Sequence, residues 1–105
     1  MQNRPNTAEA FEIMSDRFQE AAEMLKAMSS ETRLKILCAL KDGELPVNAL
    51  AELTSQSPSA VSQHLAKLRA ANLVTARRDA QTMYYRSIEG VGHRIVDTLC
   101  NHYES

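Results

Sequence analysis

The chain has 105 residues, a length typical of one domain that buries about two thirds of the surface its unfolded form exposes. Its 12 basic and 13 acidic residues give a formal net charge of -1, which taken alone argues against a nucleic-acid binder. The charge is segregated, however, because residues 57–86 carry five bases and one acid between two acidic flanks. A cationic segment inside an acidic chain indicates a polyanionic partner for that segment.

Several classes of protein are excluded by the composition. No apolar run reaches the roughly 18 residues of a membrane span, and residues 1–10 lack the cationic start and apolar stretch of a signal peptide. We therefore expect a cytoplasmic protein without membrane contact. Because the cytosol keeps thiols reduced, Cys38 and Cys100 do not predict a disulfide framework. Each can be a core residue, a metal ligand or a redox-active thiol, and the sequence leaves these alternatives open. No paired carboxylates, glycine-rich phosphate loop or nucleophile–base pair is present, so we expect neither an enzyme nor a cofactor.

The first predicted helix spans about residues 7–28. Asn6 and Glu9 have the spacing of a capping box at its start. Apolar residues then recur at steps of three and four, at Phe11, Met14, Phe18, Ala21, Leu25 and Met28. This pattern predicts a helix that packs against another helix.

A second helix is predicted to follow Ser29 and Ser30 and to continue to about Lys41. Its apolar residues spread around nearly the whole circumference, which is typical of a buried helix. Asp42-Gly43 ends this helix, and Pro46 precedes a short third one that carries Leu50 and Leu53. Residues 54–56 then form a tight turn.

The fourth predicted helix begins at Ser57-Pro58, a cap followed by proline at the first helical position, and ends near Asn72. Its buried stripe consists of Val61, Leu65 and Leu68, and its outer face consists of Ser59, Ser62, Gln63 and Lys67. Residues 73–87 are rich in β-formers and predict a hairpin with a basic tip at 77–81. A last helix, about 88–103, packs through Ile95, Leu99 and Tyr103. The fold class is therefore mainly α with a β-hairpin wing.

The order of these elements predicts a winged helix-turn-helix, with the helix-turn-helix at about 46–72 and the wing at about 73–87. A DNA major groove about 12 Å wide admits a helix, and short side chains near its start can approach the base edges. Gln63 can pair with adenine through two hydrogen bonds, and Ser59 and Ser62 can bind bases or phosphates. Ser57 and the backbone N–H groups behind it are suited to a phosphate.

The basic side chains of the wing complete the predicted DNA-binding set. We expect Arg77, Arg78 and Arg86 to follow the flanking backbone or to enter the minor groove, with Gln81 beside them. His64 can contact a phosphate or hydrogen-bond within the helix-turn-helix, and the second role is favoured. The alternative to DNA binding is a small helical domain whose 58–72 helix is merely amphipathic.

From about Ala22 to Tyr85 the sequence resembles the ArsR family of dimeric winged-helix repressors. The resemblance lies in residues 25–29 (LKAMS), 33–34 (RL), 59–65 (SAVSQHL) and 77–81 (RRDAQ), and its nearest branches are NolR-like and HlyU/BigR-like. It implies repression at an imperfectly palindromic double-stranded operator by a homodimer built from helices 7–28 and 88–103. The residues of these helices expected at the dimer interface are Phe11, Met14, Phe18, Leu25, Ile95, Leu99 and Tyr103.

The resemblance also implies possible metal sites, because many members of the family bind metals through a paired-cysteine motif at the start of the third helix or an Asp/His set on the last helix. In this chain residues 45–48 hold no thiolate, and only Glu89 and His102 match the last-helix set. Two ligands of four do not make a closed site, so no metal is expected. An unconventional set along the last helix, His93, Asp97, Cys100 and Glu104, stays open, although a solvated helix face explains these residues more simply.

The resemblance also implies a role for the thiols. Cys38 matches a cysteine of the sulfide- and persulfide-responsive HlyU/BigR-like members, whose second cysteine corresponds here to Glu104. Cys100 lies four residues earlier, about 6 Å back along the helix, so a direct disulfide with Cys38 is left open. Two interpretations remain: a switch based on thiol oxidation or reactive sulfur, and two free thiols in a repressor with no switch. A winged-helix protein-interaction module is the alternative from another class.

Overall fold

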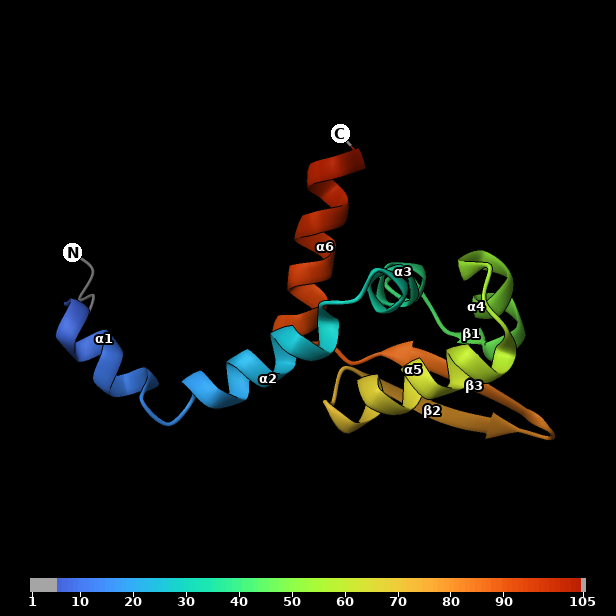
Figure 1. The fold of residues 1–105 in the computed structure, drawn as a ribbon, viewed down its shortest axis with the longest axis horizontal. Helices are drawn as coiled ribbons and strands as arrows, with labels where there is room; N and C mark the ends of the chain where they lie inside the picture. The colour runs from blue at the N-terminus through green and yellow to red at the C-terminus, as the bar shows by residue number, and fades with distance from the viewer. Residues whose placement is uncertain (1–5, 105) are drawn as a thin grey trace.

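The computed structural model describes residues 6–104 (Figure 1). Six helices and three strands follow one another along this part of the chain. In order they are α1 Thr7–Met14, α2 Phe18–Met28, α3 Glu31–Ala39, β1 Leu45–Pro46, α4 Val47–Thr54, α5 Pro58–Ala70, β2 Val74–Asp79, β3 Thr82–Ser87 and α6 Val91–Glu104. The predicted class, mainly helical with a β wing, is confirmed.

The core lies between α3, α4, α5 and the sheet. Its fully buried side chains are Ile36, Leu40, Leu50, Leu65, Leu68, Val61 and Val74, and Met28 from α2 and Val96 from α6 join the same cluster. The predicted stripe of α5 and the predicted burial of α3 are thereby confirmed. Because apolar burial holds α5 by its inner stripe, its opposite face stays in solvent.

The strands form one antiparallel sheet in the order β1-β3-β2. β2 and β3 make the predicted hairpin, with Val74 opposite Ser87 and Asp79 opposite Thr82. The two residues between the strands, Ala80 and Gln81, form its tip. The expectation that the tip begins at residue 77 was therefore wrong, because the ladder continues to Asp79 and keeps the arginines within β2.

Strand β1 was missed by the sequence analysis. It has only two residues, Leu45 opposite Tyr85 and Pro46 opposite Tyr84. Pro46 was interpreted as the approach to a helix, and it also serves as the N-cap position of α4. A strand this short has no alternation to detect, and proline is tolerated because β1 is at the edge of the sheet.

The prediction of a continuous helix over 7–28 was wrong. The capping box of Asn6 and Glu9 is present, but α1 ends at Met14 and α2 begins at Phe18. The Ser15 hydroxyl donates to the Glu12 carbonyl at 2.9 Å, and the Arg17 N–H donates to the Met14 carbonyl three residues back at 2.7 Å. Serine and aspartate compete for backbone hydrogen bonds in this way, which weakens a helix interior.

The last helix starts at Val91, about three residues after the predicted start. The Ile88 N–H donates to the Leu73 carbonyl at 3.0 Å instead of entering a helix, and Gly90 has a φ of 155°, which other residues rarely adopt. Gly92 is buried against Leu73, whose side chain a Cβ at this position would strike. These contacts fix where α6 leaves the core.

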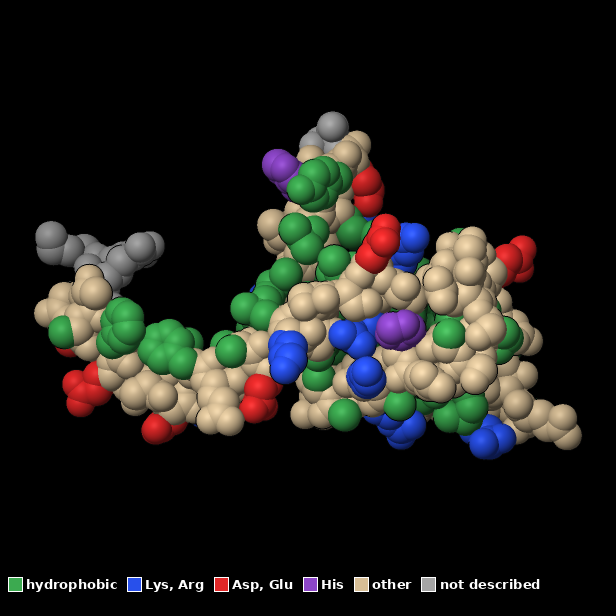
Figure 2. All heavy atoms as spheres, viewed as in Figure 1, with side chains coloured by type: hydrophobic (Ala, Val, Ile, Leu, Met, Phe, Trp, Pro, Cys, Tyr) green, Lys and Arg blue, Asp and Glu red, His purple; other side chains and the backbone are tan. Residues whose placement is uncertain are grey.

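Helices α1 and α2 form an arm that extends from the core, and α6 stands beside it (Figure 1). A row of hydrophobic side chains follows the arm and continues along α6 (Figure 2). Of the predicted dimerisation residues, Ile95 is half-buried, whereas Phe11, Met14, Phe18, Leu25, Leu99 and Tyr103 are exposed in the single chain. Within residues 6–104, no helix is long and apolar enough to cross a membrane.

Candidate nucleic-acid interface

The turn before α5 aims this helix outward. Ser55 ends α4 in the left-handed conformation, with a φ of 55°. The Ser57 hydroxyl then accepts a hydrogen bond from the Ala60 N–H at 3.1 Å, and Pro58 occupies the first helical turn. The predicted turn and cap are confirmed. The Ser57 hydroxyl is therefore engaged in capping, and the exposed start of α5 leaves its first backbone N–H groups pointing toward solvent.

The residues of the predicted outer face lie together on one side of α5. Ser59, Ser62, Gln63 and Lys67 are all exposed, and the buried stripe of Val61, Leu65 and Leu68 lies opposite. The three small or amide side chains are polar without being charged, and they occupy the first half of the helix. A helix with this face can enter a groove without a steric obstacle from its own side chains.

His64 lies between this face and the core. Its side chain is half-buried, and its Nδ1 atom is buried without a hydrogen-bond partner among the described residues. Burial lowers the pKa of His64, and the positive charges of Arg33 and Lys67 lower it further. The imidazole is therefore neutral at pH 7, and the expected hydrogen bond within the helix-turn-helix is not made by Nδ1.

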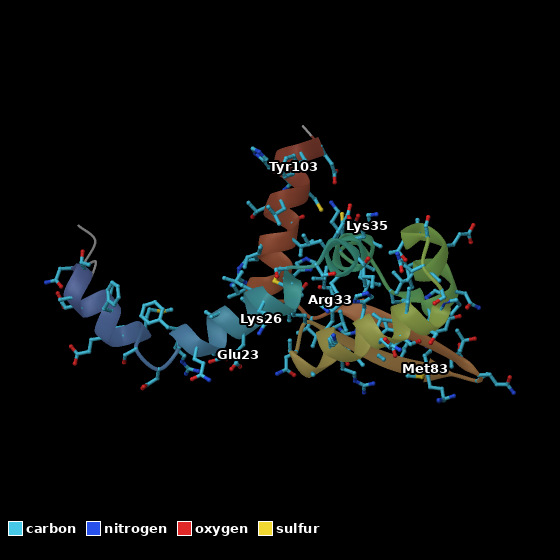
Figure 3. All side chains as sticks on the ribbon, in the orientation of Figure 1. Glu23, Lys26, Arg33, Lys35, Met83 and Tyr103 are labelled. Carbon is cyan, nitrogen blue, oxygen red and sulfur yellow. The ribbon has the colours of Figure 1, made fainter. Side chains whose placement is uncertain are left out.

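Arg33 is a neighbour that the sequence analysis did not assign to this surface. It projects from α3 toward α5 (Figure 3), and its Nε atom is also buried without a partner among the described residues. Basic side chains consequently continue from α5 onto α3 (Figure 2). The RL pair at 33–34 was noted for the resemblance, but only the packing of α3 on α5 reveals where this arginine points.

Arg77 of the wing has a partner within the chain. Its guanidinium donates from Nε to both carboxylate oxygens of Glu44, at 3.1 and 3.0 Å, and it lies over the Tyr84 ring at 4.8 Å. The hydrogen bond from Arg77 lowers the pKa of Glu44, and the same bond raises the pKa of Arg77. Arg77 thus ties the wing to the segment before β1, whereas Arg78 is exposed.

The two remaining wing residues of the predicted set, Gln81 and Arg86, are exposed on the hairpin. Gln81 is at the tip and Arg86 is near the far end of β3. The wing therefore presents cationic groups along its length rather than at its tip alone. Neither Arg33 nor Glu44 was predicted to belong to this surface, and no local pattern connects Glu44 to Arg77.

The two cysteines meet at the junction of α3 and α6. Cys38 Sγ and Cys100 Sγ are 2.8 Å apart, so the four-residue offset from the family position does not keep them separate. The path of α6 across α3 compensates for the offset. Burial raises the pKa of Cys100 to about 11, and the hydrogen bond with Cys38 contributes to this rise. Both side chains are half-buried.

An ion pair borders the thiols. Lys41 Nζ lies 3.7 Å from Glu104 Oε2, and the Lys41 side chain is 16% exposed. Burial alone would lower the pKa of Lys41, but the carboxylates of Glu104 and Asp42 raise it by more. Glu104 was predicted among possible ligands along the last helix and at the position of the second family cysteine, but its ion pair with Lys41 was not predicted.

Comparison with known proteins places this fold in a family. The sequence profile of the bacterial regulatory proteins of the arsR family matches residues 30–76. The nodulation protein NolR of Rhizobium meliloti is 49% identical over 83 residues, which cover 79% of this chain and 68% of NolR. The structure of reduced HlyU from Vibrio cholerae has a TM-score of 0.82 at 40% identity and covers 88% of this chain and 97% of HlyU.

A third similar structure is that of a homodimer. The winged helix-turn-helix DNA-binding domain Mb0332 from Mycobacterium bovis, described as homodimeric, has a TM-score of 0.74 at 27% identity and covers 99% of this chain and 91% of that one. The resemblance to the NolR-like and HlyU-like branches is confirmed by these matches. The chain therefore belongs to the ArsR family, whose members are winged helix-turn-helix transcriptional regulators and not enzymes.

Proposed function

We propose that this protein is a cytoplasmic, homodimeric repressor that binds a palindromic DNA operator through α5 and the wing. The observation that carries the proposal is the exposed polar face of α5, formed by Ser59, Ser62, Gln63 and Lys67 opposite a fully buried stripe. The whole chain would act as a single winged-helix domain, with the arm and α6 for dimerisation and the remainder for DNA.

The roles on DNA follow from side-chain chemistry. Gln63 can donate to and accept from adenine, which makes it the main candidate for sequence discrimination. Ser59 and Ser62 serve bases or phosphates, and the start of α5 offers backbone N–H groups to a phosphate. Lys67, Arg78 and Arg86 neutralise phosphates without reading sequence.

A dimer is supported by the exposed apolar row along α1, α2 and α6. Phe11 is 62% exposed and Tyr103 is 79% exposed in the single chain. Exposed apolar patches of this kind are typical of protein–protein interfaces. Two copies related by a two-fold axis would present two α5 helices to half-sites about one helical turn apart, and such half-sites form a palindrome. A dimer seated on this operator blocks transcription.

The proposal includes release of DNA by thiol oxidation or reactive sulfur. The two sulfurs lie 2.8 Å apart, so one thiol of the pair would attack the oxidant and the other would then displace the leaving group. Disulfide formation removes two protons and two electrons; hydrogen peroxide accepts them and leaves as two waters, and disulfane leaves as two molecules of hydrogen sulfide. The bond would fix α3, which packs on α5, to α6.

Operator binding can be tested with the purified chain. We expect selection from random duplexes to yield a palindrome that binds more tightly than random DNA at about 150 mM salt, where non-specific binding is weak. Gln63→Ala should mainly relax sequence preference, at a cost of roughly 1–3 kcal/mol at one position of each half-site. Absence of any preferred duplex would contradict the proposal and favour the protein-interaction module, as would a monomer in solution.

The direction of regulation and the thiol switch need separate measurements. Transcription in vitro from a template carrying the selected operator should fall when reduced protein is added, and a rise would indicate an activator. Operator affinity should be compared before and after treatment with peroxide or polysulfide, with intact mass measured on the same samples. Equal affinities together with a mass showing modified cysteines would eliminate the switch and leave a repressor without one.

A further inference from the structure

Three metal-ligating side chains converge where α6 crosses α3. Cys38 Sγ, Cys100 Sγ and a carboxylate oxygen of Glu104 all lie within 4.8 Å of one another. Cys100 and Glu104 are four residues apart on α6, which places them on the same face of the helix. Cys38 comes from α3, 62 residues earlier in the chain. The unconventional ligand set predicted along α6 did not include the Cys38 sulfur, because Cys38 lies on a different helix.

The chemistry of the set is selective. Thiolates are soft ligands that favour thiophilic ions over Mg²⁺ and Ca²⁺, and two cysteines with one carboxylate are an ordinary set of protein ligands for Zn²⁺. We infer that reduced Cys38 and Cys100 form, with Glu104, a three-ligand site for a thiophilic divalent cation, Zn²⁺ or its analogue Cd²⁺. It is neither of the two metal sites typical of the family, because Cys38 supplies a ligand from α3.

Binding requires small movements. In a tetrahedral site with Zn–S distances of about 2.3 Å, two sulfurs lie roughly 3.8 Å apart, so the present separation of 2.8 Å must increase. Glu104 is the last residue of α6 and is exposed, which lets its carboxylate follow the ion. Each thiol loses one proton on coordination, so one ion releases two protons. With three protein ligands, a fourth position is left to water.

Lys41 controls access to the carboxylate. Its ammonium pairs with Glu104 at 3.7 Å and carries a positive charge next to the site. An incoming cation must displace this ion pair and is repelled by the same charge. Lys41 therefore weakens the site, and its removal should strengthen metal binding, whereas removal of an ordinary surface lysine should not.

The inference does not depend on the proposed repressor function, although both involve the same sulfurs. A bound cation would hold the thiols as metal thiolates and would slow their oxidation. Metal binding and operator binding can be measured separately, on reduced protein without DNA and on metal-free protein with DNA. Failure of one measurement leaves the other intact.

The test is a Cd²⁺ titration of the reduced full chain, followed by the ultraviolet absorption of the cadmium–thiolate bond, with Zn²⁺ as competitor. We expect one ion per chain. Cys38→Ser and Cys100→Ser should each weaken binding by at least about 100-fold, and Glu104→Gln by about 10-fold. Lys41→Met should tighten binding by roughly 3- to 10-fold. Circular dichroism of each variant establishes that it is folded.

Asp97→Asn is the matched control, because Asp97 is another exposed carboxylate of α6 outside the cluster. It should leave the affinity unchanged. Equal losses in Asp97→Asn and Glu104→Gln would show attraction by general negative charge and would overturn the three-ligand site. Cadmium affinity that survives either cysteine substitution in a folded protein, or that falls in Lys41→Met, would also overturn it.

Discussion

His64 shows how a single residue on the recognition helix is constrained from several sides. Its imidazole is half-buried, and both Arg33 and Lys67 place positive charge near it. These conditions favour the neutral ring, and the buried Nδ1 atom has no partner among the described residues. Protonation in the folded chain would bring a charge into a buried and already positive environment.

At the residue scale we expect acid to destabilise the protein through His64. The folded-state pKa lies below the ordinary value of 6.5, so as the pH falls through this range the unfolded chain takes up the proton first. The contribution of this residue to the free energy of unfolding should therefore be retained at pH values above the ordinary pKa of 6.5 and decline as the pH falls through it. Urea unfolding between pH 7.5 and 5.5 measures the decline.

His64→Gln should reduce that pH dependence. An identical pH dependence in wild type and His64→Gln would show that the ring is not held neutral by its surroundings. It would then favour direct phosphate contact by a charged histidine.

The wing is the element in which neighbouring side chains take different roles. Adjacent residues of a strand project to opposite faces, so the exposed side chains of Arg77 and Arg78 point to opposite sides of β2. Arg77 is occupied by Glu44 and Tyr84, whereas Arg78 is exposed. The paired arginines therefore divide into one that holds the wing on the body of the protein and one that is available to a phosphate.

At the element scale we expect Arg78→Ala to weaken binding to all DNA sequences and to lower the slope of log affinity against log salt by about 1. Arg77→Ala should lower the stability by less than about 1 kcal/mol, because its ion pair is partly exposed. The double variant should combine both effects. Fluorescence anisotropy over a salt series and urea unfolding provide the two measurements.

Arg94→Ala, at an exposed position of α6, is the control and should alter neither the salt slope nor the affinity. Equal salt slopes for Arg78→Ala and the wild type would remove Arg78 from the interface. A loss of affinity confined to one operator sequence would instead make it a base-reading residue.

The molecule is more elongated than a compact domain with the same number of residues. Its radius of gyration is 16.2 Å, with extents of 51 × 32 × 23 Å, against about 13 Å for a compact chain of 100 residues. The excess comes from the arm, in which the Phe11 and Phe18 rings lie 5.4 Å apart across the break between α1 and α2. In the proposed dimer, a second copy would cover these exposed aromatic side chains.

At the scale of the molecule we expect Phe11→Ser plus Phe18→Ser to convert the dimer to a folded monomer. Both side chains are largely outside the core, so the free energy of unfolding of the single chain should change little. Operator affinity should fall at least about 100-fold, because one half-site supplies only part of the contacts. Sedimentation velocity and anisotropy measure the two effects.

Leu53→Ser is the matched control, since Leu53 is 63% exposed on α4, away from the arm. It should remain dimeric. A double-serine variant that still sediments as the Leu53→Ser control does would place the dimer interface elsewhere.

Features that depend on neighbours within a few residues could be predicted from the amino-acid sequence. The cap at Ser57, the inner stripe of α5 and the outer polar face follow from local periodicity and hydrogen-bonding chemistry. The order of the elements then predicted the winged helix-turn-helix. The same local reasoning failed where propensities were balanced, as at Ser15, where side-chain hydrogen bonding competed with the helix.

Contacts between residues far apart in the sequence could not be predicted and follow from how the helices and the sheet pack. Glu44 and Arg77 are 33 residues apart, and Cys38 and Cys100 are 62 residues apart. Such contacts depend on how α3, α6 and the sheet pack, and a shift of one helical turn changes them while leaving every local pattern intact. The family position had therefore left the cysteine pair open, and the path of α6 across α3 brought the two sulfurs together beside Glu104.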